Sequence, residues 1–316
     1  MQKQLLPPAI FLMGPTASGK TALSVQLAQA LGGEIISVDS ALVFKGMDIG
    51  TAKPTLEERA GIPHHLIDIL EPNQSYSTGQ FRHQALSLMR DISERGKIPI
   101  LVGGTQLYFN ALVNGLAVLP VANVEIRKQL DQDLLDFGKE VLHQRLAEVD
   151  PVAAARIHPN DPQRVQRALE VYEISGQSLS SFFKVEVDNE LPYQAIKLII
   201  APSDRKELHD IIAQRFRAML AQGFVEEVQG LYQRGDLNEL MPSMRAVGYR
   251  QVWAYLQGVD DLEVMTEKAI IATRQLAKRQ FTWLRRVTDA ISFETGQENL
   301  LVDVMALVNT QLCMKG

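Results

Sequence analysis

The stretch Ala9-Ile-Phe-Leu-Met-Gly-Pro-Thr-Ala-Ser-Gly-Lys-Thr21 decides the fold. Its apolar first half indicates a strand that ends at Gly14, a loop continues to Gly19, and an amphipathic pattern runs from Thr21 to Leu31. The order G-x-x-x-x-G-K-S/T between a strand and a helix is typical of a phosphate-binding loop, or P-loop. We therefore predict an α/β fold with a parallel sheet core.

Each part of this loop suits an anion. Glycine permits backbone conformations that turn successive N–H groups toward one phosphate. The helix N-terminus and Lys20 add positive charge, and the Thr21 hydroxyl can contact a Mg²⁺ held between phosphate oxygens. A chance match would give an ordinary strand–turn–helix, which the flanking pattern disfavours. The residues expected to bind a diphosphate or polyphosphate are Gly14, Pro15, Thr16, Ala17, Ser18, Gly19, Lys20 and Thr21.

Composition limits the class of protein. With 316 residues, 46% of them hydrophobic, the chain can form one large globular domain and a smaller one. A formal net charge of −5 disfavours a generally basic nucleic-acid coat but permits a local basic face. The single cysteine, Cys313, fits a reducing compartment. Since no signal-like start or run of about 18 apolar residues occurs, we expect a cytoplasmic protein without a membrane partner.

Two further strands are expected to end beside the P-loop. The apolar run 33–38 is followed by Asp39, and the run 98–102 by Gly103-Gly104-Thr105. Ligands of open parallel sheets collect beyond the carboxyl ends of the strands, so Asp39 and Thr105 should lie near one crevice. Asp39 could accept a proton or help to bind a metal, or it could simply cap a helix. The sequence leaves both interpretations of Asp39 open.

The alternation of strands and helices stops near Gly115. Helices are then expected over 124–137, 139–146, 151–156 and 163–175. We predict a core of residues 1–115 and 195–316, interrupted by a small all-helical insertion domain, residues 116–194. The polar residues that follow Asp161-Pro162 form either a solvated helix face or a surface that contacts phosphates and bases.

A basic stretch lies far along the chain. Residues 268–286 contain six lysines and arginines and no acidic residue, with Phe281 and Trp283 among them. Phosphate contacts combined with stacking side chains suit a single-stranded RNA loop. The alternative is a helix whose aromatic residues are core and whose charges are solvated.

Together these stretches resemble the tRNA dimethylallyltransferase (tRNA isopentenyltransferase) family. The matches follow the family order from about residue 9 to residue 286. No zinc-finger ligand set like that of eukaryotic members occurs, so the resemblance is to the bacterial type. The matching stretches are Gly14–Thr21, Ser37–Leu42, Lys45–Pro54, Leu101–Thr105 with Leu107–Phe109, Asp161–Arg164, Arg215–Phe216 with Met219–Leu220, Val247–Arg250, and Thr273–Gln280 with Thr282–Arg285.

The resemblance implies a P-loop nucleotide-kinase-like fold and a specific reaction. A dimethylallyl group would pass from dimethylallyl diphosphate to N6 of the adenosine 3′-adjacent to the anticodon of a tRNA. By this resemblance Asp39 is the general base, Thr105 and Arg215 act at the leaving group, and Mg²⁺ is the cofactor. We favour a monomer. The first alternative is a P-loop kinase of a small molecule or nucleotide. The second is a non-enzymatic RNA-binding protein of the P-loop NTPase or switch type.

The resemblance also implies contacts with the tRNA anticodon stem-loop. These positions are Asp39, Ser40, Ala41, Leu42, Thr105, Arg127, Gln163, Arg164, Val165, Gln166, Arg167, Arg245, Ala246, Val247, Gly248, Tyr249, Arg250, Lys278, Arg279, Gln280, Phe281, Thr282, Trp283, Leu284 and Arg285.

Overall fold

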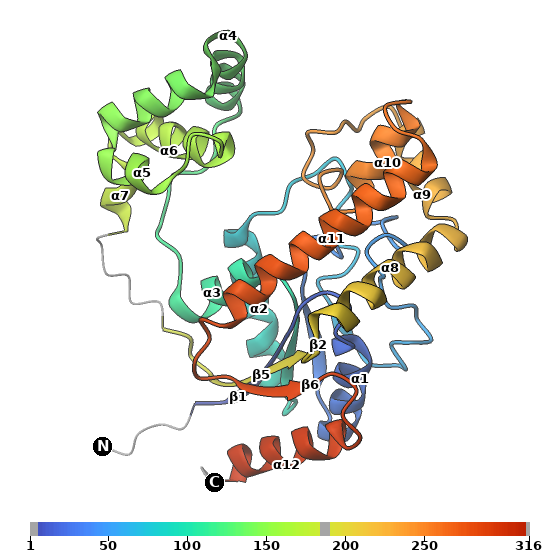
Figure 1. The fold of residues 1–316 in the computed structure, drawn as a ribbon. Helices are drawn as coiled ribbons and strands as arrows, with labels where there is room; N and C mark the ends of the chain where they lie inside the picture. The colour runs from blue at the N-terminus through green and yellow to red at the C-terminus, as the bar shows by residue number, and fades with distance from the viewer. Residues whose placement is uncertain (1–5, 184–189, 314–316) are drawn as a thin grey trace, which may run out of the picture. The chain divides into compact units, whose positions relative to one another are not determined.

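The computed structural model describes residues 6–183 and 190–313 (Figure 1). The chain divides into two compact units, one of Met1–Val113 with Leu191–Gly316 and one of Asn114–Glu190. No helix within the described ranges is long and apolar enough to cross a membrane.

A parallel sheet forms the centre of the larger unit. Its strands are β1 (Pro8–Met13), β2 (Glu34–Val38), β3 (His64–His65), β4 (Pro99–Gly103), β5 (Gln194–Ala201) and β6 (Ile291–Glu294). Among the described residues the order is β3-β2-β4-β1-β5-β6, and every pairing is parallel. Gly103 is in register with Met13 on one side and with Val38 on the other. The loops that follow β1, β2 and β4 therefore begin at one edge, and the predicted fold class is confirmed.

Helices cover both faces of this sheet. In the larger unit they are α1 (Lys20–Leu31), α2 (Thr78–Glu94), α3 (Gln106–Asn114), α8 (Arg205–Ala221), α9 (Phe224–Gln233), α10 (Tyr249–Leu256), α11 (Leu262–Leu284) and α12 (Leu300–Cys313). Successive residues of β1 point to opposite faces. Phe11 packs with α2 and α3, whereas Leu12 packs with α1 and α12. Because both faces are buried, the central strands are continuous apolar runs.

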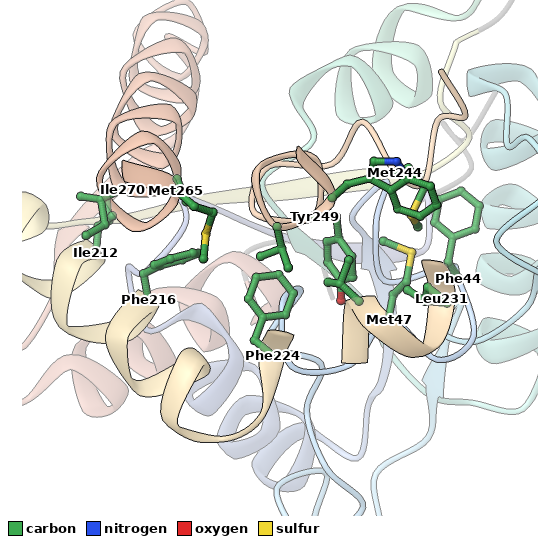
Figure 2. Close-up of a cluster of buried hydrophobic side chains, with 14 of the residues drawn as sticks. Phe44, Met47, Ile212, Phe216, Phe224, Leu231, Met244, Tyr249, Met265 and Ile270 are labelled. Carbon is green, nitrogen blue, oxygen red and sulfur yellow. The ribbon is translucent and has the colours of Figure 1, made fainter. Parts of the chain in front are cut away.

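A third apolar cluster joins α8–α11 to the loop after β2 (Figure 2). Phe224 makes edge-to-face contacts with Phe216, at a centroid distance of 6.0 Å, and with Tyr249, at 5.0 Å. Phe44 and Met47 bring the loop into the same cluster. Two stretches that carry the family resemblance, far apart in the sequence, therefore share one core.

Glu227, on α9, fixes the backbone of that loop. Its Oε2 accepts hydrogen bonds from the N–H groups of Asp48, at 3.0 Å, and Ile49, at 2.7 Å, and the Tyr249 hydroxyl donates to its Oε1. Gly50 leaves no room for a side chain, because a Cβ there would lie 2.1 Å from Cε2 of Phe224.

A second buried carboxylate, Glu34, stands at the amino end of β2, away from the edge where the loops begin. It accepts hydrogen bonds from Arg95 Nη2 at 2.9 Å, Lys97 Nζ at 2.8 Å and His65 Nε2 at 2.8 Å. The hydrogen bond from Arg95 is the main cause that holds the pKa of Glu34 well below its usual range. His65 is thus a structural partner, and the described residues contain no group of three or more His, Cys, Asp and Glu side chains that could hold a metal.

The smaller unit is helical. Its helices are α4 (Val124–Val149), α5 (Pro151–Arg156), α6 (Pro162–Ser175) and α7 (Leu179–Phe182). Gly138 has a φ of 82° and breaks α4 between the two helices that the sequence predicts there. Asp161 caps α6, accepting a hydrogen bond from the N–H of Arg164 at 3.3 Å, and Pro162 occupies the first turn. Leu142 and Val165 belong to the core that joins α4 to α6.

Candidate active site at the carboxyl edge of the sheet

The P-loop, residues 14–21, connects β1 to α1. Ala17, with a φ of 64°, and Gly19, with a φ of 77°, both adopt left-handed backbone conformations. Such alternation turns successive N–H groups to one side and forms a concavity that suits an anion. At Gly14 a Cβ would lie 2.2 Å from the carbonyl oxygen of Ile200, so glycine lets the loop pass directly against β5.

Lys20 reaches back across this loop. Its Nζ donates to the carbonyl oxygen of Pro15 at 2.5 Å and to Ser18 Oγ at 3.2 Å. Burial lowers the pKa of Lys20 to about 7, the Asp39 carboxylate counteracts this, and the Arg215 guanidinium lowers it further. A diphosphate beside Nζ would favour the protonated ammonium, because a nearby negative charge stabilises the charged form.

Asp39 follows β2 and holds a turn with one oxygen. Its Oδ1 accepts hydrogen bonds from the N–H groups of Ala41, at 2.8 Å, and Leu42, at 3.4 Å. No helix begins there, so the interpretation of Asp39 as a helix cap is wrong. Its Oδ2 makes no hydrogen bond with the described residues. A carboxylate with one oxygen fixed and the other open has the geometry of a proton acceptor.

Thr105 ties the end of β4 to the Asp39 turn. Its Oγ1 accepts a hydrogen bond from the N–H of Ser40 at 3.2 Å, and its own N–H donates to the carbonyl oxygen of Val38 at 3.2 Å. The hydroxyl proton of Thr105 therefore stays available for a further acceptor. As the sequence predicts, the two strand-end residues lie together.

Arg215, on α8, brings a second cation close enough to interact with Asp39. Burial lowers the pKa of Arg215, and the Asp39 carboxylate raises it. Within the described ranges its guanidinium makes no hydrogen bond or ion pair with the protein. A guanidinium withdrawn from water in this way is stabilised by an anionic ligand.

The oxygen groups near the P-loop fit a magnesium ion that the substrate itself helps to hold. Thr21 is exposed in the first turn of α1, and its hydroxyl makes no hydrogen bond with the part of the chain described. Mg²⁺ commonly binds through one or two protein groups, substrate phosphates and water. The hydroxyl of Thr21 and a diphosphate supply ligands of that kind.

The outer face of α11 is basic. Lys278, Arg279 and Arg285 are exposed, and so is Thr282. Trp283 is 40% exposed and lies beneath the guanidinium of Arg286, which is 5.3 Å from its ring centroid. Phe281 instead packs against the third cluster and is half-buried, so Trp283 is the more exposed of the two interleaved aromatic residues.

Burial corrects part of the predicted tRNA surface. Val165, Tyr249 and Leu284 are at most 4% exposed, and Gly248 is also buried. The side chains of Val165, Tyr249 and Leu284 complete hydrophobic cores and are unavailable to RNA. In the same stretches Arg245 and Arg250 are exposed, whereas Ala246 and Val247 are half-buried.

In the helical unit, the predicted cations have protein partners. Glu170, only 1% exposed, accepts hydrogen bonds from Arg127 Nε at 2.9 Å and from Arg167 Nη1. Burial raises the pKa of Glu170, but these arginines outweigh it and lower the pKa overall. Gln166 Nε2 donates to Asp131 at 2.8 Å. Gln163 and Arg164 lie exposed in the first turn of α6.

Three functional or structural contacts escape sequence reasoning. Glu227 and the amide of Gln280 each fix a predicted motif from a distant place in the chain, and Glu170 holds Arg127, which is 43 residues away. No local sequence pattern identifies these residues. The partners of Glu227 in the loop after β2, for example, are 177 to 179 residues away.

The sequence is similar to those of known proteins. Residues 42–287 match the family model described as IPP transferase. A tRNA dimethylallyltransferase of Methylococcus capsulatus is 57% identical over 93% of this chain and 95% of its own length. Another, of Nitrosococcus oceani, is 57% identical over 93% of both chains.

Solved structures of similar proteins have the same fold. The tRNA isopentenylpyrophosphate transferase of Bacillus halodurans superposes with a TM-score of 0.72 at 37% identity, over 98% of this chain and 97% of that one. A eukaryotic dimethylallyltransferase acting on tRNA superposes with a TM-score of 0.82 at 30% identity, over 98% of this chain and 80% of its own. The chain therefore belongs to the IPP transferase family, that of the tRNA dimethylallyltransferases.

Proposed function

We propose that this chain transfers the dimethylallyl group of dimethylallyl diphosphate to N6 of the adenosine 3′-adjacent to the anticodon in tRNA, and releases diphosphate. The observation that carries the proposal is that Lys20, in the P-loop, and Arg215, on α8, both lie close enough to the Asp39 carboxylate to interact with it electrostatically. A leaving diphosphate needs the cations, and an attacking amine needs the carboxylate.

The cations would act on the leaving group. As the bond between C1 of the dimethylallyl group and the diphosphate oxygen breaks, negative charge grows on the diphosphate. P-loop N–H groups, Lys20, Arg215 and the Thr105 hydroxyl would stabilise that charge, because they are fixed before the reaction begins. Mg²⁺, held with Thr21, would supply Lewis-acid stabilisation of the same oxygens.

Asp39 would act on the acceptor. The adenine N6 attacks C1, a C–N bond replaces the C–O bond, and Oδ2 of Asp39 takes the proton that N6 loses. A base stacked in the anticodon loop cannot reach a group at the sheet edge, so the adenosine must be turned out of the stack. The turn 39–42 would contact the flipped base.

The remaining tRNA contacts are assigned to exposed polar groups. Lys278, Arg279, Arg285 and Trp283 on α11 would contact the phosphates and bases of the loop. In the helical unit, Arg127 and the first turn of α6 would contribute further contacts. We propose that the enzyme acts as a monomer in the cytoplasm.

A transfer assay tests this function directly. The protein is incubated with radiolabelled dimethylallyl diphosphate, Mg²⁺ and unmodified tRNA, beside a tube that contains labelled ATP. We expect label in the RNA and no consumption of ATP. ATP turnover without labelled RNA would favour the P-loop kinase. It would contradict the transferase function and the roles given to the tRNA-binding residues.

A further inference from the structure

Gln280 lies on the stretch of α11 that is predicted to bind tRNA, but its amide faces inward. Its Oε1 accepts a hydrogen bond from the N–H of Thr16 at 2.9 Å, and its Nε2 donates to the carbonyl oxygen of Gly104 at 3.0 Å. The partners fix the orientation of the amide, because an N–H requires an acceptor and a carbonyl oxygen requires a donor. One side chain thus bridges the P-loop and the end of β4.

The structure around Gly104 leaves room for this bridge. A Cβ at Gly104 would lie 2.4 Å from Nε2 of Gln280 and 3.3 Å from the carbonyl oxygen of Gly14. Any larger residue at that position would displace the amide. Glycine at the end of β4 is therefore explained by the close approach of the P-loop and of Gln280.

The bridge continues to the proposed base. Gly104 is followed by Thr105, whose hydroxyl accepts the N–H of Ser40 in the turn that Asp39 holds. Hydrogen bonds and short backbone links therefore run without a gap from the P-loop, through Gln280 and Thr105, to Asp39. These are the groups that must hold the diphosphate and the amine in line.

We infer that Gln280 is a positioning residue, which holds the diphosphate-binding loop at a fixed distance from Thr105 and Asp39, and is not an RNA contact. This inference rests on the proposed function and extends it. Transfer requires the donor carbon and the attacking amine to lie within about 3.5 Å of each other, and displacement of about 1 Å can slow such a reaction about 100-fold. The oxygen and the nitrogen of the Gln280 amide each already have a hydrogen-bond partner within the protein.

The variant Gln280→Met keeps the length of the side chain and removes both hydrogen bonds. We expect the single-turnover transfer rate, at saturating donor and tRNA, to fall by about 10- to 100-fold while the Kd for tRNA changes by less than about threefold. The matched control is Gln275→Met, an exposed glutamine on the same helix, which should leave both quantities unchanged. A raised Kd for tRNA with a retained rate would identify an RNA contact and overturn the proposal, as would an unchanged rate.

A second variant tests the same contact from the opposite side. Gly104→Ala displaces the amide without altering α11, and we expect the same slow transfer with retained tRNA affinity. The urea midpoint of each variant shows whether it folds. If Gln280→Met does not fold, the transfer rate of Gly104→Ala alone tests the inference. Normal transfer by folded Gly104→Ala would overturn the inference.

Failure of the proposed function would give a different result. In that case the wild-type protein labels no RNA. The affinity for inorganic pyrophosphate, measured by calorimetry, then tests the positioning of the P-loop alone. We expect Gln280→Met to bind pyrophosphate at least about tenfold more weakly than Gln275→Met, and equal affinities would overturn the inference.

Discussion

At the scale of single residues, the candidate site combines two basic side chains, Lys20 and Arg215, with one carboxylate, Asp39, that interacts electrostatically with both. Burial depresses the pKa of both Lys20 and Arg215, and Asp39 opposes the shift in each. Withdrawing charged groups from water costs free energy, and an anionic ligand recovers part of it. This arrangement favours a substrate that carries concentrated negative charge. The cations would bind that charge, whereas the carboxylate would accept a proton.

Asp39→Asn tests the carboxylate without removing the turn. Asparagine can still accept the N–H of Ala41 through Oδ1, but it cannot accept a proton. We expect the single-turnover transfer rate to fall by about 10²- to 10⁴-fold while tRNA affinity stays within about threefold. A rate close to that of the wild type would remove Asp39 from the role of base.

Arg215→Gln tests the second cation. We expect about 10²-fold slower transfer and weaker binding of inorganic pyrophosphate, because the charge on the leaving group loses a fixed partner. Arg217→Gln is the matched control, since Arg217 is on the same helix with its side chain 62% exposed and 3.8 Å from Glu267. Equal effects of the two substitutions would show that Arg215 acts only through general charge.

At the scale of elements, the sequence predicts what local patterns determine. The apolar runs of β1, β2 and β4 are read directly from the sequence, and Gly138 marks a real break between the two helices predicted there. β6 is only four residues long, and three of these are exposed, so it has no apolar run that could be recognised. It forms because the edge of β5 offers parallel pairing.

Two glycines show how packing determines the effect of a glycine-to-alanine substitution on stability. Gly50→Ala would force a Cβ against Phe224 and Tyr249, and overpacking of this kind costs about 1–3 kcal/mol. Gly230→Ala, in α9 with no atom within 4 Å of its Cβ position apart from its chain neighbours and the backbone of its own helix, should stabilise the fold by about 0.5–1 kcal/mol. Urea unfolding of both variants measures the difference. Similar unfolding free energies would contradict the close packing around Gly50.

At the scale of the whole molecule, the contacts that align the site join distant parts of the chain. Gln280 is 264 residues from Thr16, and neither Gln280 nor Glu227 stands out from its neighbours in the sequence. The sequence therefore predicts which loops meet at the sheet edge, because strand ends must meet there. It does not predict the side chains that fix the distance between them, because these depend on the folded structure.

The resistance of the fold to acid depends on Glu34. Its pKa in the folded state lies below the ordinary value of about 4.3, so the folded chain binds fewer protons than the unfolded one. The stabilisation is complete above that ordinary value and is lost as the pH falls through the folded pKa. Glu34→Gln should therefore flatten the fall in unfolding free energy between about pH 6 and pH 3. Glu94→Gln, at an exposed glutamate without an ion pair in the described residues, should keep the wild-type slope, and equal slopes would contradict the role of Glu34.

The net charge of −5 means that the molecule as a whole does not attract RNA, so affinity must come from a local basic face. If the outer face of α11 is that surface, removing Arg279 and Arg285 together should reduce the slope of log K against log salt by about 0.7 for each lost phosphate contact, as for single-stranded RNA. Filter binding of tRNA at several salt concentrations measures this slope. Arg90→Ala, on the exposed face of α2, removes one positive charge outside every predicted contact and should leave the slope unchanged. A double variant that retains the full slope would show that the charges of α11 are only solvated, and would require another surface to hold the anticodon loop.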